Sequence, residues 1–505
     1  MIALAALTGP VPKLCVVVLA GLVAAVLLTG ARRRRAIGTL GALVLAPVLL
    51  LAEIWHSPQL SLVHRHPLLA VAGAIVVLAV VGALAAAIAR RPALFGALAV
   101  LALPFRVPIQ VGGNASNLLV PLYLVVAAGS LALLVPALRG GEDHAPAHEP
   151  GWTERLLALY VVLYAVQSIY STDFEKALQQ MVFFYVPFAL LFSLLRRLVW
   201  TPKLIRICLL LVVGLALSFA ALGLLEYTTK TIILNPKLVV ANDLHTYFTV
   251  NSVFFDPDIF GRFLALVMIL LAAVLLFGER EREQLLAAVG LALLWGGLVL
   301  TLSRSSLGAL LVGLGILAAL RWRLSRTLVV TALVLVLAVA AVAVSPRTFG
   351  LNQGLNGASS GRASLIGGGV DLFAQSPVWG HGSASFVTAY RRRHSAPSQT
   401  LAASHTIPIT IAAEQGLIGT LAYAALVVVA AVGLIRRARS DPARAAIAAA
   451  FLALVFHTML YADFLEDPVT WALLGVGVAL ASQSSSPLRS PRSRIRTRDV
   501  AALSG

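Results

Sequence analysis

Runs of about 20 residues without a charged side chain recur along the whole chain, and no other feature limits the possible folds as strongly. Examples are Leu14–Ala31, Pro67–Ala89, Val107–Leu138, Gln284–Ser303, Thr327–Pro346 and Gln415–Ile435. A helix of about 20 apolar residues crosses a hydrocarbon layer about 30 Å thick. Only 12% of the 505 residues are charged, against about 25% in an ordinary soluble protein. The sequence therefore predicts an all-α polytopic membrane protein with about 12–15 transmembrane helices.

The net charge of +18 lies almost entirely in one set of loops. When the spans are threaded alternately, one side receives residues 32–35, 90–91, 139–155, 196–206, 279–283, 321–326, 436–444 and the tail after 483. These segments hold 26 of the 39 Lys and Arg but 9 of the 21 acidic residues, a net charge of +17, and the other side carries +1. Basic loops face the cytoplasm. The charge is thus explained by topology and by the lipid bilayer, and no nucleic-acid partner is expected.

Two loops on the other, extracytoplasmic side are long: residues 227–258, and residues 347–404 ahead of the last three spans. Long loops over a rigid helical scaffold often carry function. Both are rich in Gly, Ser, Asn, Arg and aromatic residues, a composition that suits a ligand with hydroxyl groups and negative charge. The alternative interpretation is that they are exposed tethers.

Several arginines stand at the extracytoplasmic mouths of the predicted spans, against the positive-inside bias. Ionisable residues at or inside the membrane boundary are costly and usually functional. They are Arg106, Arg262, Arg304 and, in the second long loop, Arg362. Guanidinium groups bind phosphate oxygens bidentately and stay charged at any relevant pH. Converging arginines on this side predict a diphosphate site, and snorkelling of Arg304 to the interface is the alternative.

The stretch "SHTIPITIAAEQGLIG", Ser404–Gly419, places one ionisable ring at the start of a span and one carboxylate inside it. Thr406 and Pro408 mark the first turn of the helix. The positive end of the helix dipole disfavours an imidazolium, so His405 is expected to be neutral near pH 7 and able to accept a proton. Glu414 is too far along the helix to touch His405. We expect it to bond a neighbouring span or to be protonated.

The same stretch fits a pattern of histidine, a polar residue, nine residues, glycine, two residues and glycine. His405, Thr406, Gly416 and Gly419 fall on this pattern, and here the chain resembles the bacterial O-antigen ligase and polymerase family. Thr406 departs from the Asn, Ser or Gln usual in that family. Three further segments resemble the family in the expected order: "VNSVFFDPDIFGRFLAL", with Asp256 and Asp258 where Asn is common, "LTLSRSSLGALL", and "GRASLIGGGVDLFAQSPVWGHGSASF".

The resemblance also implies a domain organisation. The family core has about twelve spans with both ends cytoplasmic. Counted back from the tail, it would occupy residues 93–482, preceded by extra transmembrane helices in residues 1–92. Residues 483–505 are then a basic cytoplasmic tail, expected to be disordered.

The activity implied by the resemblance is that of an inverting, type-C glycosyltransferase of the bacterial inner membrane. Such enzymes move a glycan from an undecaprenyl-diphosphate-linked donor to a glycan, lipid or protein hydroxyl on the extracytoplasmic face. His405 would be the base, with Arg304 and Arg362 stabilising the leaving diphosphate. Residues expected to help bind the diphosphate or the glycan are Arg262, Arg106, Gly380, Gly382 and Glu414. No metal ion and no cofactor are expected, because arginines replace the metal and "DPD" at Asp256–Asp258 is interpreted as a loop feature.

Two other classes of function stay open at this stage. A flippase or transporter for lipid-linked oligosaccharides would also have many spans and an outward cavity. It should carry broken helices at mid-membrane, related in two halves, and the sequence has no matching Gly- or Pro-interrupted pair. A non-catalytic relative is the second alternative. Within the family, the motifs do not separate a ligase, a polymerase and a protein O-glycosylating enzyme.

Overall fold

The structure of the protein, a computed structural model, describes most of the chain. The described residues are 9–54, 65–111, 114–138, 149–233, 238–239, 242, 248–322, 325–326, 329, 332, 336, 362–394 and 404–483. Most of the predicted span Thr327–Pro346, residues 347–361 and 395–403 of the second long loop, and the predicted basic tail from residue 484 onward lie outside them.

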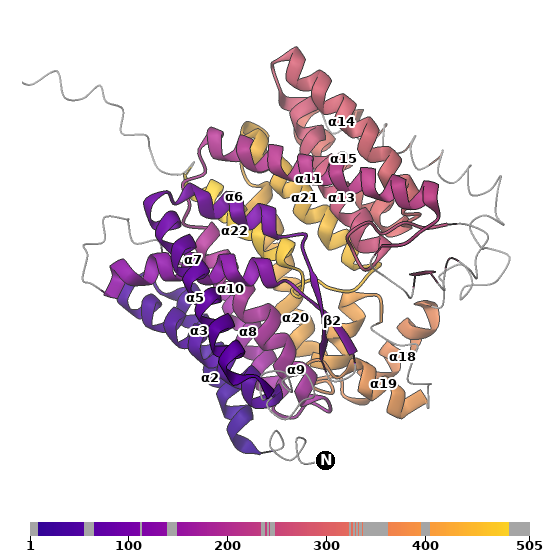
Figure 1. The fold of residues 1–505 in the computed structure, drawn as a ribbon. Coiled ribbons are helices and arrows are strands. Elements are labelled where there is room, and N and C mark those ends of the chain that lie inside the picture. The colour runs from indigo at the N-terminus through magenta and orange to yellow at the C-terminus, as the bar shows by residue number, and fades with distance from the viewer. Residues whose placement is uncertain are drawn as a thin grey trace, which may run out of the picture.

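Helices make up nearly all of the described chain (Figure 1). In the first half they are α2 (Pro10–Leu28), α3 (Arg32–Ile54), α5 (Pro67–Arg90), α6 (Ala93–Ala102), α7 (Val120–Leu138), α8 (Trp152–Ser168), α9 (Phe174–Gln180), the π-helical turn Met181–Tyr185, α10 (Val186–Leu195) and α11 (Pro202–Thr229). In the second half they are α13 (Pro257–Phe277), α14 (Glu281–Leu300), α15 (Arg304–Arg321), α18 (Arg362–Gln375), α19 (Phe386–His394), α20 (Ile407–Ile435), the 3-10 turn Ala438–Ser440, α21 (Pro442–Thr458) and α22 (Pro468–Gln483).

Ten helices in the described part are long and apolar enough to cross a membrane, and three shorter apolar helices are α6, α21 and α22. Proline stands within the first two positions of α2, α5, α11, α13 and α21, where its missing N–H costs no hydrogen bond. The prediction of an all-α polytopic membrane protein is confirmed.

One uncharged run is divided differently from the expectation. Its first residues form a hairpin of β1 (Val107–Val111) and β2 (Asn114–Leu118), with Val107 opposite Leu118. The membrane helix α7 begins only at Val120. The sequence Gly112–Gly113 between the two strands favours a tight turn over a helix. The run Val107–Leu138 is therefore a hairpin followed by one span.

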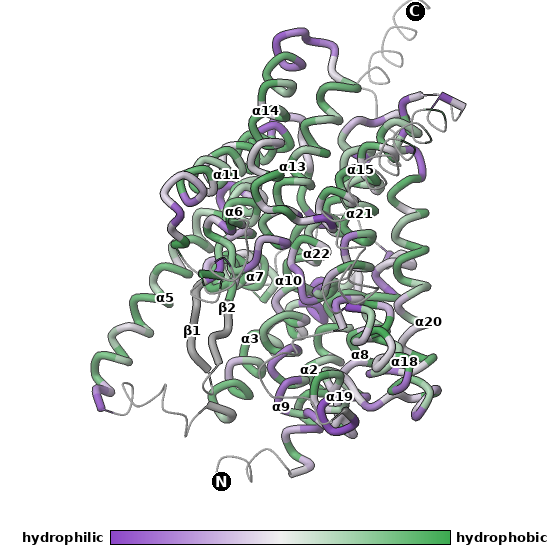
Figure 2. Tube along the Cα trace, turned by 90° about the vertical axis from the view of Figure 1, so that its right-hand side faces the viewer, coloured by the Kyte–Doolittle hydropathy of each residue, from purple (hydrophilic) through white to green (hydrophobic). Residues whose placement is uncertain are grey.

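The helices pack side by side, with α13 in the centre in contact with α14, α15 and α21. The kinked helix α20 contacts α8, α18 and α21, and α22 contacts α10 and α21. The helices of the predicted N-terminal extension pack onto this body, α2 against α8 and α5 against α7. Hydrophobic residues follow the lengths of the helices and hydrophilic residues gather at their ends (Figure 2). Many leucines and valines of α5 and α14 are exposed, as expected for faces that contact lipid.

Chain direction divides the helix ends into two groups. At one end lie the basic side chains Arg196, Arg280, Arg321, Arg436 and Arg444, and we refer to it as the basic end. The opposite end carries the starts of α9, α13, α15, α20 and α22. All four family-like segments meet at this opposite end.

Candidate active site

Left-handed backbone conformations mark the segments that meet at the opposite end. Ser252, Leu302, Ala384, His405 and Asp463 have φ values of 52°, 52°, 61°, 55° and 70°. Residues other than glycine rarely adopt positive φ, and such residues cluster at functional sites. These five account for most of the seven such residues in the described chain. The backbone is thus constrained where the predicted site residues lie.

Asp258 joins the N-termini of α13 and α15. Its Oδ1 accepts hydrogen bonds from the hydroxyls of Ser303 and of Ser305, the latter at 3.1 Å. Ser306 Oγ donates to the Asp258 carbonyl at 3.2 Å. Asp256 caps α13 by accepting from the Asp258 amide at 2.7 Å, and Ser303 caps α15. Two positive helix ends therefore face one carboxylate.

Arg362 reaches the same carboxylate from α18. Its Nη2 lies 3.5 Å from Asp258 Oδ2, and the two side chains are 30% and 22% exposed. Arg304 is the first residue of α15, directly after the capping Ser303, and its side chain is exposed. The structure thus brings Arg362 to Asp258 and puts Arg304 at the same helix end.

His405 lies next to this group, immediately before α20. Its ring centroid is 6.0 Å from that of Tyr461, whose hydroxyl donates to Asp256 Oδ2 at 2.7 Å. Burial lowers the pKa of the His405 imidazole below its usual range, and the positive charge of Arg362 lowers that pKa further. The negative charges of Asp258 and Asp463 oppose this shift. The ring is therefore neutral near pH 7, and its buried Nδ1 has no hydrogen-bond partner among the described residues.

Tyr461 also links His405 to a second histidine. The Tyr461 ring centroid lies 5.5 Å from that of His457 at the end of α21. His457 Nε2 is 3.2 Å from Ser305 Oγ and 3.3 Å from Ser306 Oγ. The two imidazoles thus border the same cluster of Asp258, serines and tyrosine from different helices.

The other two predicted arginines lie elsewhere. Arg262 is buried and forms an ion pair with Asp467, while its Nη1 points at the Asp463 carbonyl 3.5 Å away. Arg106 is half-buried just before β1, near Tyr123 of α7. Arg262 therefore holds the segment between α21 and α22, and the described contacts of Arg106 do not reach Asp258 or His405.

Glu414 and the two predicted loop glycines form an interlocked turn. The Glu414 carboxylate accepts hydrogen bonds from the backbone amides of Ala384 at 2.9 Å and Phe386 at 3.0 Å. The Gly382 amide donates to the Glu414 carbonyl at 2.8 Å. Gly380 and Gly382 have φ values of 69° and 96°. Their amide groups are used within the turn, so they shape the loop between α18 and α19.

A Cβ atom would not fit at these glycines. At Gly380 it would fall against the Glu414 carbonyl, and at Gly382 against the backbone of Ser171. Ser171 in turn donates its hydroxyl to the Ser383 carbonyl at 2.7 Å. The corner between α8 and α9 therefore holds the loop in place.

A second carboxylate, that of Glu226, holds the segment that leads into α13 by accepting hydrogen bonds from backbone amides, as Glu414 does for the Gly-x-Gly turn. Glu226, at the end of α11, accepts from the amides of Ile233 at 3.2 Å, Asn251 at 3.2 Å and Ser252 at 2.7 Å. It fixes the left-handed Ser252 ahead of Asp256. Glu226 and Glu414 thus anchor, through backbone amides, the two segments that deliver Asp258 and the Gly-x-Gly turn.

Sequence reasoning missed several members of the cluster. Asp256 and Asp258 were interpreted as a loop feature, although "DPD" before an apolar run is also a helix start with an acidic cap. In "LSRSS", Ser303 is likewise a capping residue that marks the start of α15. Tyr461, His457 and Asp467 had no sequence signal that tied them to His405. No group of three or more His, Cys, Asp or Glu side chains with metal-binding geometry occurs within the described residues.

Comparison with known proteins identifies a family that part of the chain resembles. Residues 289–424 match the family model described as O-antigen ligase. This part of the chain is therefore similar to the O-antigen ligase family. The match covers α15, α18, α19 and the first part of α20, and so includes Arg304, Arg362, His405 and Glu414. No curated protein matches the chain.

The match supports a membrane glycosyltransferase-like function in surface polysaccharide assembly. O-antigen ligase family proteins are multi-pass proteins of the bacterial inner membrane that act in surface polysaccharide assembly, with glycosyltransferase-like activity. Their donor is a lipid-linked glycan and their acceptor a glycan. Asp258 and Tyr461 lie outside the matched range but contact Arg362 and His405 within it.

Proposed function

We propose that this chain is an inverting glycosyltransferase that moves a glycan from an undecaprenyl-diphosphate-linked donor to an acceptor hydroxyl, without a metal ion. The acceptor is a glycan, a lipid or a protein. One observation carries the proposal: a neutral His405, with an unpartnered Nδ1, lies within electrostatic reach of Arg362 and beside two helix N-termini. This arrangement supports the proposed roles of His405 as base and of Arg362 as phosphate ligand.

The proposed chemistry is a single displacement. The acceptor oxygen forms a bond to the anomeric carbon of the donor sugar, while the bond from that carbon to the diphosphate oxygen breaks. The lipid diphosphate leaves with the electron pair, and His405 takes the proton of the acceptor hydroxyl. Arg362, Arg304 and the N-termini of α13 and α15 stabilise the negative charge that grows on the leaving group.

The contact of Arg362 with Asp258 suits a site that exchanges anions. At 3.5 Å and with both side chains partly exposed, the ion pair is weak, since exposed pairs contribute about 0–1 kcal/mol. A diphosphate offers more charge and more acceptor oxygens than one carboxylate. When the donor binds, its diphosphate would therefore replace the Asp258 carboxylate as the partner of Arg362.

The active site is proposed to face the extracytoplasmic side, on the basis of the charge asymmetry of the loops. Cysteine labelling tests this in the variant that lacks Cys15 and Cys208. A membrane-impermeant thiol reagent added from outside should label Trp379→Cys, since Trp379 is 56% exposed in the loop before α19. It should not label Arg280→Cys at the basic end. The reverse pattern would overturn the assignment of faces.

Transfer by purified protein tests the chemistry. In detergent, the wild-type protein should consume lipid-diphosphate glycan and extend an acceptor, with no membrane potential and no second compartment. His405→Ala should lower turnover by about 10²–10⁴-fold and still bind the donor. If detergent-solubilised protein has no transfer activity but moves the donor across a proteoliposome membrane, the chain is a transporter.

The surface-glycan profile of a deletion strain separates the finer alternatives. Accumulation of unattached lipid-linked polymer would identify a ligase, and single repeat units would identify a polymerase. A normal surface polysaccharide with an unmodified glycoprotein would identify protein O-glycosylation.

A further inference from the structure

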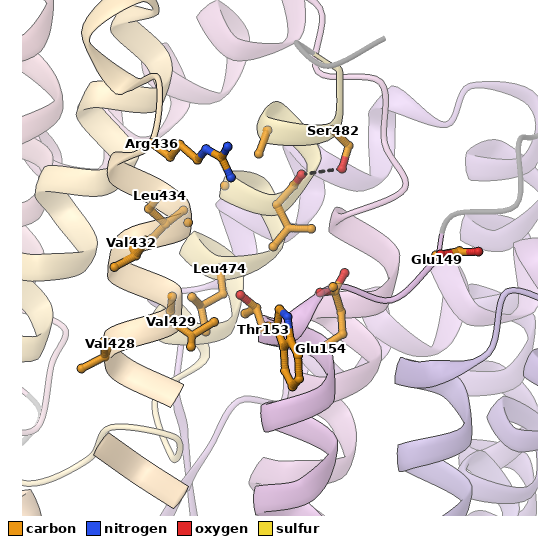
Figure 3. Close-up of a pocket in the computed structure, with 17 residues that line it drawn as sticks. Glu149, Thr153, Glu154, Val428, Val429, Val432, Leu434, Arg436, Leu474 and Ser482 are labelled. Carbon is orange, nitrogen blue, oxygen red and sulfur yellow. Dashed lines mark hydrogen bonds between the residues drawn. The ribbon is translucent and has the colours of Figure 1, made fainter. Parts of the chain in front are cut away.

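A crevice opens between α8, α20 and α22 at the basic end of the bundle (Figure 3). His405 lies at the opposite end, before the start of α20. Its volume is about 720 Å³, within the range of about 300–1,000 Å³ typical of small-molecule sites. The walls are mostly apolar and include Val428, Val432, Leu474 and Val478. Val428 and Val432 are 60% and 61% exposed, so the apolar lining faces the surroundings of the bundle.

Small residues leave the crevice open. A Cβ atom added at Gly433 would meet nothing within 4 Å. Gly477, on the opposite wall, lies so close to the Leu434 side chain that a Cβ there would clash with it. The crevice is therefore a gap held open by the packing of α20 against α22, with free space at Gly433.

The rim of the crevice is polar and carries a cation. Arg436 directly follows the last residue of α20, and its backbone N–H donates to the Val432 carbonyl one turn earlier. Its guanidinium makes no ion pair or hydrogen bond with the residues that the structure describes. Trp152, 67% exposed, lies at the rim on the start of α8, with Arg155 stacked 5.2 Å from its ring centroid. Tryptophan prefers the membrane–water interface. The rim thus lies at headgroup level.

Two carboxylates also lie at the rim. Glu154 is neutralised by Arg196 at 2.8 Å, with both side chains 2% exposed. Glu149 stands apart from Arg436 in Figure 3 and is exposed to solvent. Arg436 and Arg155 therefore leave the rim with a positive excess over Glu149.

We propose that this crevice binds one anionic phospholipid from the leaflet next to the basic end, with its phosphate on Arg436 and an acyl chain between α20 and α22. Basic pockets between transmembrane helices bind anionic headgroups. The wall from Val428 to Arg436 spans about 12 Å at about 1.5 Å per residue, which matches most of one leaflet of a hydrocarbon core about 30 Å thick. The site is independent of the chemistry proposed around His405.

Lipid binding to the delipidated full-length protein in detergent tests the proposal. Dioleoyl phosphatidylglycerol and dioleoyl phosphatidylcholine have the same acyl chains and differ in net charge. The wild-type protein should bind the anionic lipid about fivefold more tightly, the effect of about 1 kcal/mol from one arginine near a membrane surface. Native mass spectrometry gives the occupancy, and the shift in melting temperature on lipid addition gives an independent measure.

Two pairs of variants separate the charge from the cavity. Arg436→Gln should remove the preference for the anionic lipid. Arg437→Gln, which removes the same charge from the next residue, should keep it, since Arg437 lines a different hollow, against Ile316 and Leu452. Gly433→Leu should lower the affinity for both lipids, because the leucine side chain would fill the crevice. Gly214→Leu, at an exposed glycine of α11 that also has no neighbour within 4 Å, should have no effect.

Three results would overturn the proposal. Equal affinity for the two lipids in the wild-type protein would remove the anionic site. If Arg437→Gln loses the preference for the anionic lipid as completely as Arg436→Gln does, the lipid is attracted by the overall charge of the basic end and not by Arg436. Unchanged lipid binding in a folded Gly433→Leu variant would place the lipid elsewhere.

Discussion

Nη2 of Arg262 lies 2.6 Å from Oδ2 of Asp467, in an ion pair whose side chains are only 4% and 3% exposed. Asp467 Oδ2 receives no aligned hydrogen bond, so the contact is ionic. It ties the centre of the bundle, α13, to the segment that carries Tyr461 and Asp463. This segment borders both Asp256 and His405. Arg262 therefore acts on the site through the position of that segment.

The first prediction concerns this ion pair. Removing one partner of a buried pair costs about 3–5 kcal/mol, because the other charge is left uncompensated. Arg262→Ala and Asp467→Ala should each lower the melting temperature in detergent strongly. The double variant Arg262→Met, Asp467→Leu should recover most of the loss, since apolar residues of similar size can replace a buried pair.

Transfer activity of the double variant then separates two roles of Arg262. If Arg262 is a positioning residue, the stabilised double variant should show measurable transfer with an unchanged donor KM. If Arg262 binds the diphosphate, the double variant should be stable but have a donor KM raised at least tenfold. That outcome would restore the role expected from the sequence alone.

The second prediction is the pH dependence of transfer. His405 must be neutral to accept a proton, and its pKa is lowered by burial and then by Arg362. Activity should therefore be fully present at neutral pH and fall only when the pH drops through a value below the ordinary range of histidine. The acid limb of kcat/KM against pH reports the pKa in the free enzyme.

Two substitutions should move that acid limb in opposite directions. Arg362→Gln removes a positive neighbour, so the pKa of His405 rises and the limb moves to higher pH. Asp258→Asn removes a negative neighbour, so the pKa falls and the limb moves to lower pH. Shifts in the same direction, or none in either variant, would mean that the limb belongs to another group.

The third prediction tests the arginines as phosphate ligands. Arg304→Ala and Arg362→Ala should each lower donor affinity or turnover at least tenfold, which corresponds to about 1.4 kcal/mol for one charge-assisted contact. Lysine keeps the charge but loses the bidentate fork, so Arg304→Lys should lie between wild type and Arg304→Ala. Full activity in both alanine variants, with normal melting temperatures, would show that these arginines are interfacial only.

The sequence was sufficient for the broad architecture because that depends on local composition. Uncharged runs and loop charges do not require knowledge of tertiary contacts. The spacing from His405 to Gly419 is also local, since it runs from the residue before the first turn of α20 across the kink at Gly416. The hairpin before α7 was missed because its residues are uncharged, as those of a span are. The polar residues Gln110, Asn114 and Asn117 and the pair Gly112–Gly113 are the local signals against a helix.

The composition of the site depends on partners far apart in the chain. Nothing near Arg262 in sequence indicates that Asp467 will lie 2.6 Å away, and a lone arginine at a span mouth has the same pattern whether it binds phosphate or a carboxylate. Glu414 was recognised as a carboxylate that needs a partner. Its partners are backbone amides of residues 384 and 386, which carry no side-chain signal.

The fourth prediction follows from those amides. Glu414 offers two acceptor oxygens to two N–H donors, one of them on the left-handed Ala384. Glutamine keeps one acceptor and turns an NH₂ group toward the second donor, which should cost about 1–3 kcal/mol. Glu414→Ala should cost more, because it leaves both amides unsatisfied and opens a cavity.

Melting temperatures and transfer rates should follow the order wild type, Glu414→Gln, Glu414→Ala. A glutamine variant with wild-type stability and no transfer would instead give the carboxylate a direct part in the reaction. Loss of both properties together is the expected outcome for a residue that holds the loop.

The last prediction concerns the kink in α20, the helix that begins just after His405. Gly416 has φ 63° and ψ −158°, a region that is essentially restricted to glycine. The amides that follow the kink are docked on the loop before α19, with Leu417 N donating to the Pro377 carbonyl at 2.7 Å. A Cβ at Gly416 would fall against the carbonyl of Val378. Gly416→Ala should therefore cost about 1–3 kcal/mol from backbone strain alone, and more from the clash.

The matched control lies on the same helix. Gly433 has helical geometry and open space around its Cβ position, so Gly433→Ala should be neutral or stabilising by about 0.5–1 kcal/mol, the advantage of alanine over glycine inside a helix. Melting temperature in detergent and transfer per folded molecule should both fall in Gly416→Ala and stay at or above wild type in Gly433→Ala. If Gly416→Ala keeps both, the kink does not fix the loop against α20, and His405 must be positioned by its contacts with Tyr461 and its own turn alone.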